Sequence, residues 1–141
     1  MRFINLIPNM VNAFEIKKGS VVLLNFWGEN CDLKILDKFT IEIAKNGGIP
    51  VRWQNSRELI KLYYEEVDDE YLKFQDKYFQ IFKLADVVID IFMHGIAPHK
   101  DFPKEKFPVY AANMRKLFNA LTEEKDLFIQ VRVPTEENAK D

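Results

Sequence analysis

Two stretches of the chain are almost continuously apolar, residues 21–27 and 86–93. Apolar runs of this length are typical of strands covered on both faces, so we predict that both are central strands of a parallel sheet. Two further stretches, residues 49–54 and 127–133, alternate between apolar and polar positions. Alternation, together with Pro50 in the first of them, predicts strands at the edges of the sheet.

Apolar residues at helical spacing lie between these strands and predict the helices. We expect a first helix over residues 8–16, and a helix from residue 55 that Asn55 caps, with Glu58 completing a capping box. A further helix is predicted between the cap candidates at residues 30–32 and the stop at Gly47 and Gly48. Others are predicted over residues 68–85 and 108–121, and a loop of about fifteen residues with three prolines over 94–108.

This alternation predicts an α/β fold: a three-layer sandwich whose four-stranded, mostly parallel sheet has helices on both faces. Right-handed crossovers favour the strand order 2-1-3-4. The order reverses between the first and third strands, where ligands usually bind beyond the carboxyl ends. Two loops meet there, so the candidate ligand or cleft contacts are Glu29, Asn30, Asp32, His94 and His99.

Composition narrows the class of protein. The 141 residues suit a single domain, residues 1–141, and 48% of them are hydrophobic, which is enough for a core. The net charge of -2 with mixed signs argues against a nucleic-acid partner. No segment approaches the length of a membrane span, and one cysteine provides no disulfide, so we expect no membrane association and a cytoplasmic setting.

The loops offer several kinds of chemistry, which the sequence leaves open. The first loop has a single glycine, Gly28, and not the glycine pattern of a phosphate cradle, so we expect no nucleotide there. His94 and His99 are interpreted as solvated loop residues, with metal binding or general-base catalysis as the alternative.

Cys31 and Asp90 are two further candidates. Cys31, the only cysteine, is interpreted as a small buried residue or an idle thiol, with a nucleophile activated by His94 or His99 as the rival hypothesis. Asp90 lies within an apolar strand, where a carboxylate must be hydrogen-bonded, and we expect a structural role for it.

The order and spacing of four segments resemble a known family. They are residues 17–24 (KKGSVVLL), 45–50 (KNGGIP), 85–89 (ADVVI) and 134–139 (PTEENA). Together they resemble the amino-terminal domain of the metallo-aminopeptidases of the leucyl aminopeptidase or aminopeptidase T type. Gly48 stands where that family often has alanine, and Pro8 departs from its first helix.

This resemblance implies a domain without catalytic residues of its own. In the family, two divalent metal ions are held by a carboxyl-terminal domain that follows the PTxxxA segment, and no family ligand maps onto this chain. The resemblance therefore implies no catalytic residue and no metal ligand here, with residues 134–141 as a linker-like tail. It implies a partner too, either a carboxyl-terminal catalytic domain or another copy of the chain, with a peptide substrate for the whole. The alternative is a binding or interaction module that reuses the fold.

Overall fold

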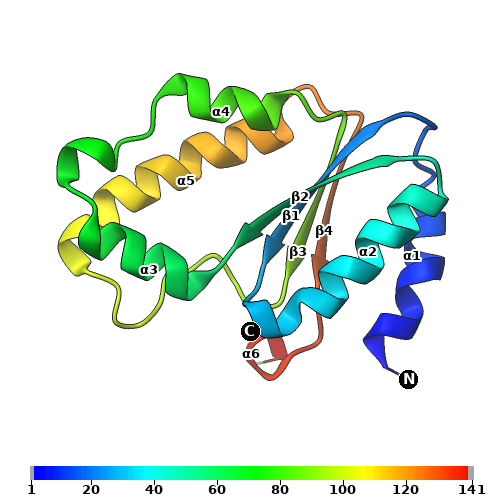
Figure 1. Cartoon of the computed structure of the whole chain (residues 1–141), viewed down its shortest axis with the longest axis horizontal. Coiled ribbons are helices and arrows are strands. Elements are labelled where there is room, and N and C mark those ends of the chain that lie inside the picture. Colours follow the sequence, from blue (N-terminus) through cyan, green and yellow to red (C-terminus); the bar gives the residue numbers. More distant parts are fainter. Residues whose placement is uncertain (1, 140–141) are drawn as a thin grey trace.

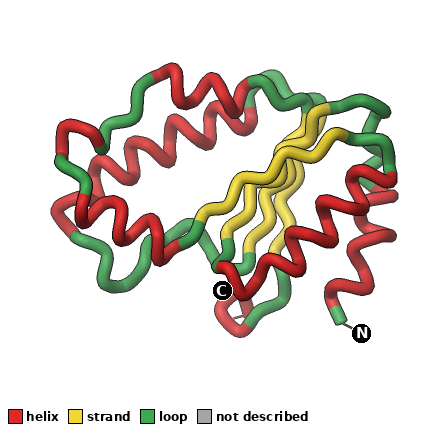
Figure 2. Tube along the Cα trace, viewed as in Figure 1, coloured by secondary structure: helices red, strands yellow, loops and turns green. Residues whose placement is uncertain are grey.

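The computed structural model describes residues 2–139, and Met1, Lys140 and Asp141 lie outside the described residues. Four parallel strands form one sheet in the order β2-β1-β3-β4. They are β1 (Val21–Trp27), β2 (Ile49–Asn55), β3 (Val87–Phe92) and β4 (Leu127–Arg132). The predicted class, strand order, central strands and edge strands are all confirmed (Figures 1 and 2).

Helices cover both faces of this sheet (Figure 1). On one face lie α1 (Ile7–Ala13) and α2 (Leu33–Lys45), and on the other lie α3 (Arg57–Glu66), α4 (Asp76–Lys83) and α5 (Phe107–Thr122). A short helix, α6 (Glu136–Ala139), follows β4 near the carboxyl ends of the strands. Short 3-10 helices span Phe3–Leu6, Asn30–Asp32, Asp69–Tyr71 and Lys104–Lys106.

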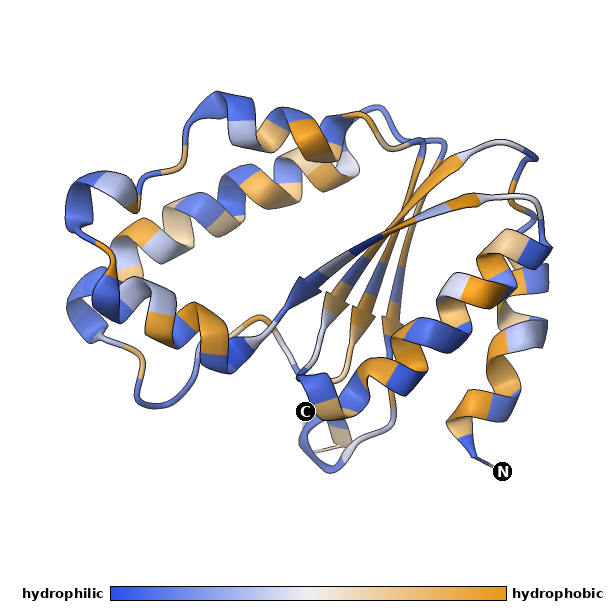
Figure 3. Ribbon diagram, viewed as in Figure 1, coloured by the Kyte–Doolittle hydropathy of each residue, from blue (hydrophilic) through white to orange (hydrophobic). Residues whose placement is uncertain are grey.

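The face under α1 and α2 is packed with apolar side chains of the strands. Val22, Leu24 and Phe26 of β1 contact α2, which contributes Phe39 and Ile43, and all five are buried. Orange and blue bands alternate along the helices in Figure 3, as expected of helices with one apolar face. Burial of apolar surface, which contributes about 25 cal/mol per Å², is the main source of the stability of the fold.

Two helix boundaries differ from the prediction for reasons that the structure shows. The first helix ends at Ala13 because Glu15 adopts a positive φ of 53°, which is a left-handed conformation that stops a helix. The helix after β2 is capped by Ser56, whose hydroxyl accepts a hydrogen bond from the Leu59 N–H, so the prediction of Asn55 as the cap is wrong. Asn55 ends β2 instead, and its amide is held inside the sheet by the carbonyl of Phe26 at 3.2 Å.

The predicted helix over residues 68–85 is broken in two. Asn113 of α5 explains the break, because its amide group binds backbone groups between the two parts. It donates to the Leu72 carbonyl at 2.7 Å and accepts from the Phe74 N–H at 3.3 Å. A side chain that satisfies these backbone groups leaves them unavailable for a continuous helix.

Residues 134–139 of the segment interpreted as a linker-like tail fold back against the sheet. The Thr135 hydroxyl donates to the Met93 carbonyl at 3.0 Å, and the Asn138 amide donates to the carbonyls of Phe92 and Val133 at 3.0 and 2.6 Å. These bonds satisfy carbonyl groups at the ends of β3 and β4. They place α6 beside the candidate site.

Candidate functional site

The carboxyl edge of the sheet brings the two predicted loops together. The loop after β1 turns at Gly28, which is buried, and a Cβ there would lie 2.6 Å from the Phe26 ring and 2.9 Å from Cγ of Met93. Only a residue without a side chain fits so close to its neighbours. The turn directs Glu29 toward the amino end of α3.

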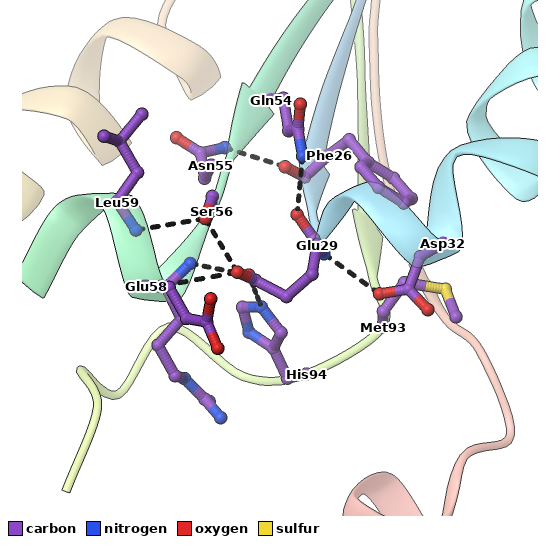
Figure 4. A network of polar contacts seen from close by, with 12 residues as sticks. Phe26, Glu29, Asp32, Gln54, Asn55, Ser56, Glu58, Leu59, Met93 and His94 are labelled. Atoms are coloured by element: carbon purple, nitrogen blue, oxygen red, sulfur yellow. Dashed lines mark hydrogen bonds and ion pairs between the residues drawn. The ribbon is translucent and has the colours of Figure 1, made fainter.

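Glu29 is the centre of a polar network at this edge (Figure 4). Its carboxylate accepts hydrogen bonds from the Ser56 hydroxyl at 2.7 Å and from the backbone N–H groups of Arg57 at 2.8 Å and Glu58 at 3.4 Å. These N–H groups are in the first turn of α3, where they have no partner within the helix and favour a negative charge. Burial raises the pKa of Glu29, but these bonds outweigh it and leave the pKa below its ordinary value of 4.5.

His94 lies beside the same carboxylate and is only 8% exposed, so its interpretation as a solvated loop residue is wrong. Its Nε2 is 3.5 Å from Oε2 of Glu29, and its Nδ1 is 2.9 Å from the Gly95 carbonyl. The carbonyl can only accept, so Nδ1 carries a proton. The burial arises because the chain after β3 turns back toward α3, which the sequence pattern did not indicate.

Asn30 and Asp32 belong to the same network and His99 does not. Asp32 accepts from the Glu29 N–H at 2.9 Å, and Asn30 accepts from the side chain of Gln54 at 3.1 Å. His99 instead accepts from the Asp101 N–H at 3.0 Å, within its own loop. Four of the five candidate residues are therefore held together, and a ligand for them stays a prediction.

An ion pair ties the network to α6. Arg57 donates to both carboxylate oxygens of Glu137, at 2.9 and 3.1 Å, and to the carbonyls of Gly95 and Ala97 at 3.1 and 3.0 Å. Glu137 also accepts from the Gly95 N–H at 3.2 Å. The hydrogen bonds from Arg57 lower the pKa of Glu137. The sequence pattern did not reveal either residue, because neither departs from the charge pattern of an ordinary helix surface.

The alternative chemistries of the loops gain no support from this geometry. Cys31 is exposed, and both histidines considered as its base have other partners: Nε2 of His94 faces Glu29, and Nδ1 of His99 accepts from the Asp101 N–H. Within residues 2–139 no three His, Cys, Asp or Glu side chains are grouped as metal ligands would be. In the same range no helix has the length and apolarity needed to cross a bilayer.

A second polar group crosses the sheet on the opposite side of the strands from α1 and α2. Asn25, Asp90 and Gln130 are in register on the adjacent strands β1, β3 and β4. The amide of Asn25 donates to Oδ1 of Asp90 at 2.8 Å and accepts from the amide of Asn55 at 2.8 Å. Burial raises the pKa of Asp90 to about 6, against the effect of hydrogen bonds from Asn25 and Gln130.

This polar row lies at a cavity of about 480 Å³ between the carboxyl halves of β1, β3 and β4 and the helix α5. The remaining walls are largely apolar and come from strands, loop and helix; they are Trp27, Phe92, Gly95, Ile96, Met114, Leu117, Phe118 and Leu121, with Arg132 at the end of β4. Asp90 thus has the hydrogen-bonded position expected of it, and it also borders a cavity, which the sequence pattern did not indicate. A signal was present, since each central strand has one polar residue within its apolar run, Asn25 and Asp90.

The fold and these sites define a class of α/β domain with a parallel sheet and a cavity near its carboxyl edge. Among solved structures, the chain is similar to wild-type AmpT from Thermus thermophilus, with a TM-score of 0.62 and 13% sequence identity. The likeness covers 91% of this chain and 36% of the AmpT chain, so this chain spans little more than a third of that protein. No family model matches the sequence, and no curated protein matches it. At this identity the likeness establishes the fold and a distant structural relationship.

Proposed function

We propose that the chain is a non-catalytic domain of the aminopeptidase T type that forms one wall of a substrate cleft. The observation that carries this proposal is the likeness to AmpT, which extends over nearly the whole of this chain but covers only 36% of the other. In this proposal the two divalent metal ions of a leucyl aminopeptidase-like hydrolase are bound outside this chain. A carboxyl-terminal catalytic domain or another copy of the chain would complete the cleft.

The carboxyl edge of the sheet is the wall that we propose. Glu29, His94 and the ion pair of Arg57 with Glu137 connect two loops and two helices there. Side chains that are already fixed by hydrogen bonds lose little conformational entropy when a substrate binds. This edge is therefore suited to support a peptide rather than to perform chemistry on it.

Hydrolysis of leucyl-p-nitroanilide by the purified chain tests the non-catalytic part. With added Zn²⁺, Co²⁺ or Mn²⁺ we expect no release of nitroaniline above the buffer rate. A known aminopeptidase in the same buffers serves as the control for the assay. Hydrolysis that rises with chain concentration and disappears with a chelator would show that the domain is itself an enzyme.

Amide resonances in the presence of a leucyl peptide test the position of the wall. We expect shifts in residues 28–32 and 93–97, at the carboxyl edge, and none in residues 17–20 and 47–48, at the opposite edge. Glu29→Gln should weaken these shifts, while Arg52→Gln on β2, whose side chain pairs with Asp37, should leave them unchanged. Shifts confined to the amino edge would contradict the proposal.

The cavity between the sheet and α5 favours a second candidate function, a module that binds a small molecule. A volume of about 480 Å³ with mostly apolar walls and a few buried polar groups is usual for ligand sites. The two functions are compatible, since the side chains of the network around Glu29 are not those that line the cavity; the two sites share Gly95.

A further inference from the structure

Asp90 is the only anionic side chain among the described residues that line the cavity between the sheet and α5. It is 3% exposed, and its hydrogen-bond partners Asn25 and Gln130 are both neutral amides. Within residues 2–139 it forms no ion pair with a lysine, an arginine or a histidine. An asparagine at this position would form the same kind of hydrogen bonds without the cost of burying a carboxylate. The sheet therefore does not need this charge, whereas a cationic ligand would use it.

The carboxylate of Asp90 has acceptor capacity left on the side of the cavity. Its two partners are in register with it on the adjacent strands β1 and β4, so they flank it along the sheet. Side chains stand roughly perpendicular to a sheet, and a carboxylate can accept about four hydrogen bonds. The remaining acceptor positions therefore face the space under α5. An ammonium group suits them, because it donates up to about three hydrogen bonds and neutralises the charge.

Aromatic side chains follow the polar row at a regular spacing. Phe92 comes two positions after Asp90 on β3, so both are on the face of the sheet that borders the cavity, and Trp27 follows Asn25 in the same way on β1. Residues two apart on a strand are separated by about 6.6 Å, which a chain of two carbon atoms between an amine and a ring can bridge. The rings of Trp27 and Phe92 stack with centroids 6.3 Å apart, and Phe118 of α5 also borders the cavity. Aromatic walls favour an aromatic ligand through offset or edge-to-face contacts, and their faces also attract cations.

The cavity provides no charged counterpart for an acidic group on the ligand. Among the described residues that line it, the only cation is Arg132, which is exposed at the end of β4 and already takes part in another interaction. The indole Nε1 of Trp27 is buried, with almost no accessible surface. A carboxylate in the cavity would lose water without gaining a charged partner. The ligand that fits is therefore an amine without an acid.

We propose that this cavity binds a primary aromatic amine of the arylethylamine type, with its ammonium group on Asp90 and its ring against Trp27 and Phe92. Met114 and Leu117 of α5 form the wall on the helix side. This proposal rests on the second candidate function, the small-molecule module, and it is independent of the peptidase-related one. Failure of either leaves the other intact, because one is tested by binding of an amine to the cavity and the other by hydrolysis and by peptide contacts at the carboxyl edge.

Calorimetric titration with 2-phenylethylamine tests the proposal. We expect saturable binding at one site per chain. Two analogues should each bind at least about tenfold more weakly, because neither brings a cation to Asp90: 2-phenylethanol, which has the same shape without the charge, and 3-phenylpropionate, which has the opposite charge. Ethylamine, which lacks the ring, should show no saturation in the same concentration range.

Variants locate the binding in the cavity. Asp90→Asn should weaken 2-phenylethylamine binding by about tenfold or more. Asp37→Asn is the matched control, because Asp37 pairs with Arg52 outside the cavity, and it should leave the affinity unchanged. The chain has two tryptophans, so Trp53→Phe leaves Trp27 as the only indole. In that variant 2-phenylethylamine should change the tryptophan fluorescence, which reports directly from the cavity. A thermal unfolding curve for each variant confirms that it is folded.

The affinity should also follow the ionisation of Asp90. The other charged residue among those described at the cavity is Arg132, which keeps its charge at all ordinary pH values, so Asp90 is the lining group that titrates near neutrality. Burial raises the pKa of Asp90 to about 6. Binding of 2-phenylethylamine, whose ammonium group stays charged, should therefore weaken by about tenfold from pH 7 to pH 5, and Asp90→Asn should lose this dependence. An affinity of the wild-type chain that stays constant over this range would contradict the proposal.

Three further results would overturn the proposal. One is the absence of saturable binding of 2-phenylethylamine by the folded wild-type chain at millimolar concentration. Another is equal affinity for 2-phenylethanol, which would leave a small-molecule module that recognises an apolar ring and not an amine. The third is binding that survives Asp90→Asn in the folded variant, which would place the ligand elsewhere on the molecule.

Discussion

The two faces of the sheet use the same strands for different purposes. Toward α1 and α2, the strands present Val22, Leu24 and Phe26 from β1 and Ile89 and Ile91 from β3, all of them buried and apolar. Toward α5, a row of polar side chains interrupts the apolar residues of β1 and β3, which resume with Trp27 and Phe92 at the cavity. Leu23 and Val88 pack against the helices there, and then Asn25 and Asp90 replace the apolar residues.

This difference matches the way the helices lie on the sheet. Leu117 and Leu121, in the carboxyl half of α5, pack with Leu23 and Val88. Beyond them the polar row begins, and the space between sheet and helix widens into the cavity. One face is therefore filled along its whole length. The other exchanges part of its apolar packing for a hydrogen-bonded floor under a cavity.

Truncation of side chains should give the largest difference in the free energy of unfolding between the two faces. Leu24→Ala removes a fully buried side chain from the filled face and should lower the free energy of unfolding by roughly 3–5 kcal/mol. Phe118→Ala removes a larger side chain at the cavity, but Phe118 is 50% exposed, so its loss should be below about 1 kcal/mol. Urea denaturation of both variants measures the difference, and equal losses would mean that the two faces are equally well packed.

The pH dependence of stability should identify the cost of the polar row. The pKa of Asp90 is about 6 in the folded chain and 3.8 when the carboxyl group is free in water, so the folded state binds more protons between these values. Stability contributed by Asp90 is therefore present below pH 3.8 and is lost as the pH rises through 6, by about 3 kcal/mol in all. Asp90→Asn removes this loss.

We therefore expect Asp90→Asn to gain stability relative to the wild type as the pH rises from about 4 to 7. Gln130 is exposed and can rotate to accept from the new amide, so no donor need be left without a partner. Denaturant midpoints at a series of pH values measure the gain. A constant difference between the two proteins across this range would show that Asp90 does not titrate there.

The charge of Glu29 should affect the free energy of unfolding less than that of Asp90, and in the opposite direction, because it stabilises the fold. Glu29→Gln removes the charge that stabilises the first turn of α3 and should cost about 1–2 kcal/mol at pH 7. The pKa of Glu29 is below 4.5 in the folded chain, so its contribution is present above pH 4.5 and is lost as the pH falls through the folded pKa. Chemical denaturation should show a larger cost at pH 7 than at pH 3. Glu58→Gln, at an exposed residue of the same turn, is the matched control.

The sequence predicts the filled face better than the face that borders the cavity. Continuous apolar runs and helical spacing depend on burial alone, so they indicate β1, β3 and the helices that cover them. The sequence pattern favours Asn55 over Ser56 as the cap of α3. The pattern misses that Asn55 donates to the carbonyl of Phe26, which lies 29 positions away in the sequence. The burial of His94 likewise depends on Glu29, which lies on another loop. Contacts between such distant segments leave no periodic pattern in a single sequence.

Gly48 gives another instance of the same limit. It stands where the family that the sequence resembles often has alanine, a change that looks small. A Cβ at Gly48 would nevertheless lie 2.9 Å from Cγ2 of Ile43 and 3.1 Å from Cγ2 of Val22. The filled face therefore has no room for the extra methyl group, and only the packing reveals this.

The ion pair between Arg57 and Glu137 should have the smallest effect on global stability and a clear local one. Glu137→Gln should change the free energy of unfolding by less than about 1 kcal/mol, because the carboxylate is 49% exposed and water competes for its charge. Hydrogen exchange should nevertheless speed up at Ala139, whose N–H bonds to the Thr135 carbonyl within the α6 turn. Glu136→Gln, the neighbouring acidic residue, leaves the pair with Arg57 intact and should leave exchange unchanged. Faster exchange in both variants would mean that the general charge of the segment, and not this pair, holds α6 against the site.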